Sequence, residues 1–130
     1  MNKKVIKTDK APSALGPYSQ AIVAGGMVYT AGQIGIDPAT GKLAGNDIEV
    51  QARQVMKNLE AVLASAGGSF TDVVKSTVYL ADLNDFAKVN DIYQEKFVDN
   101  PPARSTVQVS ALPLGALVEI DMIAALPGGS

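Results

Sequence analysis

Side chains that suit the binding of a small anion form one row between Arg104 and Gln108. Two consecutive prolines precede this row and favour extended geometry, so we expect a strand over residues 103–109. Alternation along a strand places Arg104, Thr106 and Gln108 on one face. A planar guanidinium beside a hydroxyl and an amide can recognise a carboxylate. A polar sheet face that simply meets water has the same pattern, and this strand alone leaves both interpretations open.

Two carboxylates, Glu119 and Asp121, form a second row in an otherwise apolar segment, residues 116–125, that we predict to be a strand. The link between the two strands is short enough for a hairpin. If paired residue numbers sum to about 225, Arg104 lies opposite Asp121 and Thr106 lies opposite Glu119, so the two polar rows share a face. Glu119 is then either the group that handles a proton or simply the ion-pair partner of Arg104.

The chain has neither histidine nor cysteine. Their absence excludes disulfides, thiol catalysis, serine–histidine–aspartate triads and zinc sites built from histidine and cysteine. No group of acidic residues has the spacing of a calcium loop, so we expect no metal site. Acid or base catalysis must therefore depend on Asp, Glu, Tyr, Lys or water.

Charge and hydropathy exclude further classes of function. The 11 basic and 13 acidic side chains leave no basic surface typical of nucleic-acid binding. No apolar run approaches the roughly twenty residues of a membrane span. No apolar signal region follows the N-terminal lysines, so we expect a cytoplasmic protein.

Hydrophobic periodicity predicts the elements that must position the polar rows, in one domain over residues 1–130. Gly25-Gly26 is typical of a two-residue hairpin turn. Residues 34–45 are expected to be a connecting loop. The two predicted helices run from a cap at Asn46 or Asp47 to about Ala66, and from a cap at Asp82 or Asn84 to about Phe97. The predicted strands cover residues 5–8, 18–24, 27–32, 73–80, 103–109 and 116–125.

This order of elements favours an α+β fold with two helices on one face of a mixed sheet. The other face carries both polar and apolar residues and points to self-association. Two more residues are candidates for a site. Tyr18 follows a Gly-Pro turn and is either a site residue or a core aromatic. Asn90 lies in the apolar stripe of the second helix, and a structural hydrogen bond to a loop backbone is its favoured interpretation.

The run Pro102-Ala103-Arg104-Ser105, followed by Leu112-Pro113 and Val118-Glu119-Ile120, resembles the C-terminal signature of the reactive intermediate deaminase family (RidA, formerly YjgF). The resemblance covers nearly the whole chain. Its further matches are Ala14-Leu15-Gly16-Pro17-Tyr18-Ser19-Gln20-Ala21, Ala31-Gly32-Gln33-Ile34, Gln51, Asn58, Phe86, Val89, Asn90 and Tyr93.

The resemblance implies a chorismate-mutase-like fold in a homotrimer with clefts between subunits. It also implies a cofactor-free enzyme that hydrolyses 2-aminoacrylate and related 2-imino acids to 2-keto acids and ammonia. Arg104 would then hold the substrate carboxylate, and Glu119 would orient the water. Tyr18, Thr106, Asn90 and the backbone at Gly32 would contribute to binding. A binding module without turnover, a ribonuclease and a purely structural trimer are the alternatives.

Overall fold

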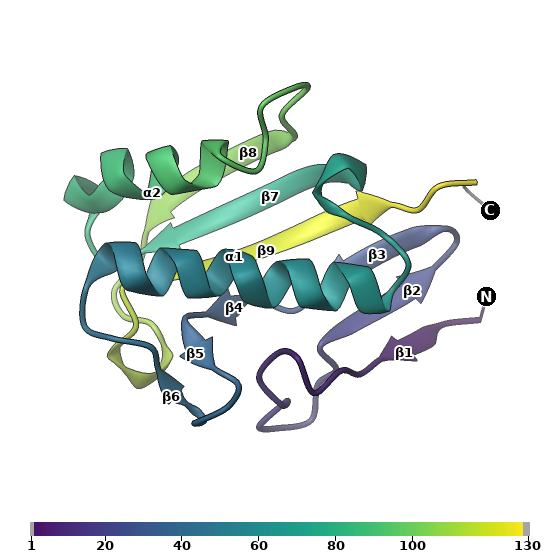
Figure 1. Cartoon of the computed structure of the whole chain (residues 1–130), viewed down its shortest axis with the longest axis horizontal. Coiled ribbons are helices and arrows are strands. Elements are labelled where there is room, and N and C mark those ends of the chain that lie inside the picture. The colour runs from purple at the N-terminus through teal and green to yellow at the C-terminus, as the bar shows by residue number, and fades with distance from the viewer. Residues whose placement is uncertain (1, 129–130) are drawn as a thin grey trace.

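In the computed structural model, which describes residues 2–128, two helices cover one face of a mixed sheet (Figure 1). The main sheet has the strand order β1-β2-β3-β9-β7-β8, with β4 paired to β9, and β5 and β6 form a separate ribbon. The predicted α+β class and the placement of both helices on one face are confirmed. The strands are β1 (Lys4–Ile6), β2 (Ala21–Ala24), β3 (Met27–Thr30), β4 (Gln33–Ile34), β5 (Ile36–Asp37), β6 (Lys42–Leu43), β7 (Val73–Leu80), β8 (Ala103–Gln108) and β9 (Val118–Ala125), and the helices are α1 (Ile48–Ser65) and α2 (Phe86–Gln94).

Local sequence chemistry explains the best-predicted boundaries. Gly25 and Gly26 both have positive φ angles, 59° and 77°, and they close the hairpin between β2 and β3. Asp47 caps α1, because its carboxylate accepts hydrogen bonds from the backbone N–H groups of Glu49 and Val50. The strand predicted over residues 73–80 is β7.

Other predicted boundaries are wrong for physical reasons. The strand expected to begin at Tyr18 begins at Ala21, because the segment before it is a loop held by side-chain hydrogen bonds. The expected connecting loop, residues 34–45, contains the short strands β5 and β6. The second helix begins with a 3₁₀ turn, Leu83–Asp85, and its α-helical part ends at Gln94 rather than near residue 97.

The predicted hairpin between β8 and β9 is wrong, because β7 lies between them. β8 pairs with β7 in parallel, with Arg104 opposite Ser76, whereas β9 pairs with β7 antiparallel, with Glu119 opposite Tyr79. Arg104 is therefore not opposite Asp121, and Thr106 is not opposite Glu119. The link between the strands passes the end of β7: the N–H of Val109 donates to Leu80, and the N–H of Ala81 donates to Leu117. Loop length alone cannot distinguish neighbouring strands from strands that flank a third.

The register also separates the two polar rows. Arg104 and Thr106 lie on the helix-covered face with Ser76 and Val78, their partners in β7. That face also holds the core residues of β9, all buried under the helices: Val118, Ile120, Met122 and Ala124. Glu119 and Asp121 lie on the uncovered face, since side chains alternate along a strand.

The uncovered sheet face is partly apolar in this single chain. Tyr29 is 45% exposed and Val107 is 42% exposed, and the half-buried Ile123 lies directly opposite Tyr29. No helix among the described residues is long and apolar enough to cross a membrane. An exposed apolar sheet face is typical of a surface that packs against another molecule.

Candidate active site

Glu119 projects from the middle of the sheet toward the backbone of Gly32. Its strand, β9, is held on one side by β7 and on the other by the two-residue strand β4, which directly follows Gly32. A Cβ atom added to Gly32 would come within 2.8 Å of the Glu119 carboxyl carbon, and closer still to Oε2. The carboxylate therefore occupies space that only glycine leaves open.

A cavity of about 240 Å³ opens beside this carboxylate. Tyr18, Gly32 and Glu119 line it, and the exposed side chains of Leu15 and Leu114 stand at its rim. The Tyr18 hydroxyl accepts a hydrogen bond of 3.2 Å from the N–H of Leu15. Tyr18 is 54% exposed, so its interpretation as a core aromatic is wrong and the cavity is its environment.

Burial raises the pKa of the Glu119 carboxyl above its ordinary value, and the nearby charge of Asp121 raises it further. Asp121 itself accepts a hydrogen bond of 3.1 Å from the Tyr79 hydroxyl. The ion pair between Glu119 and Arg104, which was one of the two interpretations of Glu119, is absent. Within residues 2–128 the one ion pair joins Arg53 and Glu95 on the helix surface. A half-buried carboxylate without a cationic partner is suited to accept a proton.

Arg104 lies in a different environment, at the edge strand β8 and under α2. It lines a second cavity, of about 400 Å³, together with Asn90, Tyr93 and Pro102. Its guanidinium carbon lies 4.7 Å from the ring centroid of Tyr93 and 5.5 Å from that of Phe86. These distances fit cation–π contacts.

Asn90 and Thr106 accompany Arg104. Both residues are half-buried, and Thr106 follows Arg104 on the same face of β8. The hydrogen bond expected between the Asn90 amide and a loop backbone is not among the hydrogen bonds of residues 2–128. Asn90 is less buried than its position in the apolar stripe suggests, because it faces the cavity beside Arg104.

The predicted site residues thus form two groups. Tyr18, Gly32 and Glu119 share one cavity, whereas Arg104 shares another with Asn90. β7 lies between β8 and β9, so the two residues are separated by two strand spacings of about 4.8 Å each. Their partners in β7, Ser76 and Tyr79, are three residues apart, and the Cα atoms of Arg104 and Glu119 are therefore roughly 14 Å apart. Their side chains point to opposite faces of the sheet. One chain therefore does not bring these two side chains together.

Three buried amides that our sequence reasoning did not assign to the site support the Glu119 cavity. Gln51 on α1 donates to the carbonyl of Gly45 and accepts from the N–H of Leu117, both at 2.8 Å. Asn58 donates to the carbonyls of Ile34 and Ile36, at 3.3 and 2.9 Å. Together they tie α1 to the loop around β4 and to the residues just before β9. A signal was present in the sequence, since both amides lie close to the apolar stripe of α1.

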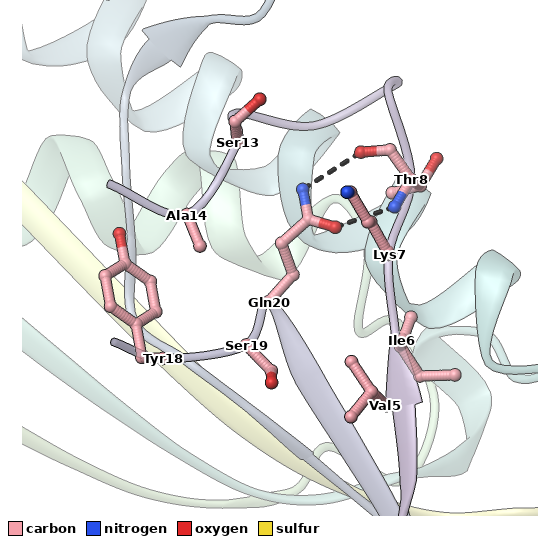
Figure 2. Close-up of a pocket in the computed structure, with 9 residues that line it drawn as sticks. All are labelled: Val5, Ile6, Lys7, Thr8, Ser13, Ala14, Tyr18, Ser19 and Gln20. Atoms are coloured by element: carbon pink, nitrogen blue, oxygen red, sulfur yellow. Dashed lines mark hydrogen bonds between the residues drawn. The ribbon is translucent and has the colours of Figure 1, made fainter. Parts of the chain in front are cut away.

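Gln20 makes the third connection. Its amide accepts from the N–H of Thr8 at 2.7 Å and donates to the carbonyls of Thr8, Ala11 and Pro12. Figure 2 shows the bonds between Gln20 and Thr8, with Tyr18 on the neighbouring loop beside a cavity of about 290 Å³. The buried amide fixes the loop that carries Tyr18, and it adjoins both this cavity and that of Glu119. No group of three or more potential metal ligands occurs among the described residues.

Comparison with known proteins identifies the family. Residues 8–126 match the family model described as Endoribonuclease L-PSP. The human 2-iminobutanoate/2-iminopropanoate deaminase is 49% identical over 122 residues, which cover 94% of this chain and 89% of the human protein. The crystal structure of RidA from an Antarctic Psychrobacter species superposes with a TM-score of 0.91 at 47% identity, over 95% of this chain and 99% of that one.

The Escherichia coli protein TdcF, solved with bound serine, also has a TM-score of 0.91, at 42% identity and over 95% of this chain and 99% of that one. Similarity of this extent, over nearly the full length of each of these proteins, shows that the chain belongs to the RidA family. The family suggested by the sequence signature is thereby confirmed.

Proposed function

We propose that this protein is a hydrolase that converts reactive 2-imino acids, including the imine form of 2-aminoacrylate, into 2-keto acids and ammonia. The observation that carries the proposal is the Glu119 carboxylate, which lies beside a cavity and against the Gly32 backbone, with its pKa raised by burial. The identity of the human relative supports the same reaction. We further propose a cytoplasmic location, small imino and keto acids as ligands, and no nucleic acid or membrane as a partner.

The chemistry needs little beyond positioning and one base. The substrate is a protonated imine, H₂N⁺=C(R)–COO⁻, whose carbon is already electrophilic. Glu119 accepts a proton from a water molecule as the water oxygen bonds to that carbon. Glu119 returns this proton to the nitrogen of the resulting aminoalcohol. It then accepts the hydroxyl proton as the C–N bond breaks and the C=O bond forms. The departing NH₃ takes up that proton, so the products are O=C(R)–COO⁻ and NH₄⁺, and Glu119 is ionised again. No metal, cofactor or nucleophilic side chain takes part in these steps.

We propose that the complete site forms between two subunits of a homotrimer. Glu119, Tyr18 and Gly32 come from one chain, and Arg104, Thr106 and Asn90 come from its neighbour. Two features of the single chain support this arrangement: the two groups lie on opposite faces of the sheet, and β8 is an edge strand with one side unpaired. Arg104 would hold the substrate carboxylate in a two-pronged contact.

The test of the activity is a coupled assay. A serine or threonine dehydratase generates the imino acid in place, and the rate of pyruvate or 2-oxobutanoate release is measured with and without this protein. The proposed function requires a rate increase that is proportional to the added protein and that falls by about 10²–10⁴-fold in Glu119→Gln. An unchanged rate of release would refute deaminase activity.

Mixing two impaired variants, assayed at a substrate concentration well below KM, tests the shared site. Arg104→Lys and Glu119→Gln are denatured together in equal amounts and refolded, which gives trimers of random composition. A shared site is intact only where the chain that contributes Glu119 is the Arg104→Lys variant and its neighbour, which contributes Arg104, is the Glu119→Gln variant. Each condition is met half of the time, so about one interface in four is intact. Activity should therefore return to about a quarter of the wild-type value. No recovery in mixed trimers would show that one chain contributes both residues.

A binding module without turnover is the second candidate, because TdcF was solved with bound serine. It predicts ligand binding without any rate increase in the coupled assay. The family description as an endoribonuclease raises a third possibility, but the net charge of −2 and the absence of histidine argue against RNA cleavage.

A further inference from the structure

Aromatic rings, and not carboxylates, surround the guanidinium of Arg104. The guanidinium carbon lies 4.7 Å from the centroid of Tyr93 and 5.5 Å from that of Phe86, both on α2. Within residues 2–128 no acidic side chain forms an ion pair with Arg104. A carboxylate neighbour would neutralise the guanidinium and compete with an incoming anion. Ring faces attract the cation while its N–H groups remain able to donate.

The Tyr93 ring is itself fixed at its hydroxyl end. Its hydroxyl forms a buried hydrogen bond with the Ser76 hydroxyl, and Ser76 is the residue of β7 directly opposite Arg104 in β8. Tyr93 is only 5% exposed and Ser76 is fully buried, so the hydroxyl pair has no competing water. The paired strands β7 and β8 therefore hold both the backbone of Arg104 and Ser76, the residue that fixes the Tyr93 ring. The side chain of Arg104 contacts this same ring.

Other aromatic rings restrict Tyr93 from the side. The ring of Phe97 lies 4.6 Å from that of Tyr93, and Phe70 packs edge-on against Phe97 at 5.4 Å. Phe70 and Phe97 are both buried. A ring held by a hydrogen bond at one end and by packing at its side gives the guanidinium a fixed surface.

We propose that Tyr93 and Phe86 are positioning residues for carboxylate recognition: they hold the guanidinium of Arg104 in one orientation without neutralising it, and Ser76 orients Tyr93 for this task. The proposal rests on the proposed function, in which Arg104 receives the substrate carboxylate. It assigns the aromatic residues of α2 to substrate binding, although none of them has to touch the substrate. A long arginine side chain at a sheet edge would otherwise lose conformational entropy on binding.

Three variants separate this role from simple packing. Tyr93→Leu removes the ring face and keeps an apolar side chain. Tyr93→Phe keeps the ring face and removes the hydroxyl. Phe70→Leu is the matched control, because it removes a buried ring from the same aromatic cluster, where Phe97 separates it from Tyr93.

Each variant is measured for KM and kcat in the coupled assay, for the Kd of 2-oxobutanoate by calorimetry, and for thermal unfolding. Tyr93→Leu should raise both KM and Kd about 2- to 30-fold, the range to which cation–π energies convert, with kcat changed less. Tyr93→Phe should lose thermal stability because the buried Ser76 hydroxyl loses its partner. Its KM should rise by no more than about threefold, less than in Tyr93→Leu, because the ring loses the orienting bond to Ser76 but is still held by Phe97. Phe70→Leu should lose stability with KM and Kd unchanged.

The results distinguish failure of this proposal from failure of the proposed function. A wild-type protein that binds 2-oxobutanoate without turnover, and loses affinity in Tyr93→Leu, would refute the deaminase and support the positioning role. Turnover with unchanged KM and Kd in folded Tyr93→Leu would overturn the positioning role alone. So would an equal rise in KM in Phe70→Leu, or a Tyr93→Phe variant as impaired as Tyr93→Leu.

Discussion

Replacement of Glu119 by glutamine is the sharpest test of the proposed mechanism, because it keeps the shape of the side chain and removes its charge and basicity. The half-buried side chain lies against Gly32 and has no cationic partner among residues 2–128. Glutamine can fill the same space beside the glycine. We therefore expect a folded variant whose defect lies in catalysis.

The expected magnitude follows from the role of Glu119 as a base. Loss of a general acid or base lowers kcat by about 10²–10⁴-fold. KM should change much less, because the carboxylate of the substrate is held by Arg104 and not by Glu119. Burial also raises the pKa of Glu119 above its ordinary value of 4.5, so the acidic limb of the wild-type rate profile should lie above that pH. This limb should be missing from the residual activity of Glu119→Gln.

The same variant makes a prediction about stability, and its sign can be derived. A folded-state pKa above the unfolded value means that the folded chain holds the proton more tightly. The unfolding free energy then falls as pH rises through the interval between the two pKa values. At neutral pH the folded protein still bears this whole loss of stability, because it buries an ionised carboxylate. Glu119→Gln removes the carboxylate and with it the loss. The variant should therefore gain stability relative to wild type when the pH is raised from about 4 to 7.

These measurements use the coupled assay for kcat and KM and urea unfolding at two pH values. An unchanged kcat in Glu119→Gln would refute its role as a base. A variant that loses stability relative to wild type as pH rises would instead show that Glu119 is ionised beside a cation, as the ion-pair interpretation requires. The kcat of the variant tests the role of Glu119 as a base, and the pH dependence of its stability tests whether Glu119 is paired with a cation. Each result can be read without the other.

Three further predictions follow from the described contacts. Gly32→Ala should lower kcat strongly while the chain stays folded, because the new Cβ would displace the Glu119 carboxylate; a fully active variant would refute this close approach. Arg104→Lys should raise KM despite its retained charge, since an ammonium cannot form the two-pronged contact, and wild-type efficiency would exclude Arg104 from the site. Sedimentation equilibrium at micromolar concentration should give three times the chain mass of 13.5 kDa, whereas a fully active monomer would refute the shared site.

Much of the fold could be predicted from the sequence because local chemistry determines it. The turn at Gly25-Gly26 requires positive φ angles, and the cap at Asp47 satisfies free N–H groups at the start of α1. The alternation that placed Arg104 and Thr106 on one face of β8 is also local, and the register confirms it. Each of these features depends on neighbours within a few residues.

The pairing of β8 and β9 could not be predicted in the same way, because it depends on a strand far away in the sequence. β7 is linked to β8 through α2, and this arrangement places the two strands in parallel and leaves the other edge of β7 free for β9. One inserted strand and its register are enough to put Arg104 and Glu119 on opposite faces. The parity argument that placed them together was valid only for direct neighbours.

This error bears on function, because a hairpin would have put the anion-binding group and the base within one chain. In the observed topology the base lies in the middle of the sheet, on the face without helices and beside a cavity. The guanidinium lies on the other face, under α2, at the edge formed by β8. Each group has a distinct local support: Gln51 and Asn58 hold the backbone around Glu119, whereas Tyr93 holds Arg104. Two half-sites that are separately rigid and face different directions are useful for catalysis only if another subunit brings them together. Self-association is therefore part of the proposed mechanism, and the partly apolar uncovered face and the open edge of β8 are the surfaces through which it would occur.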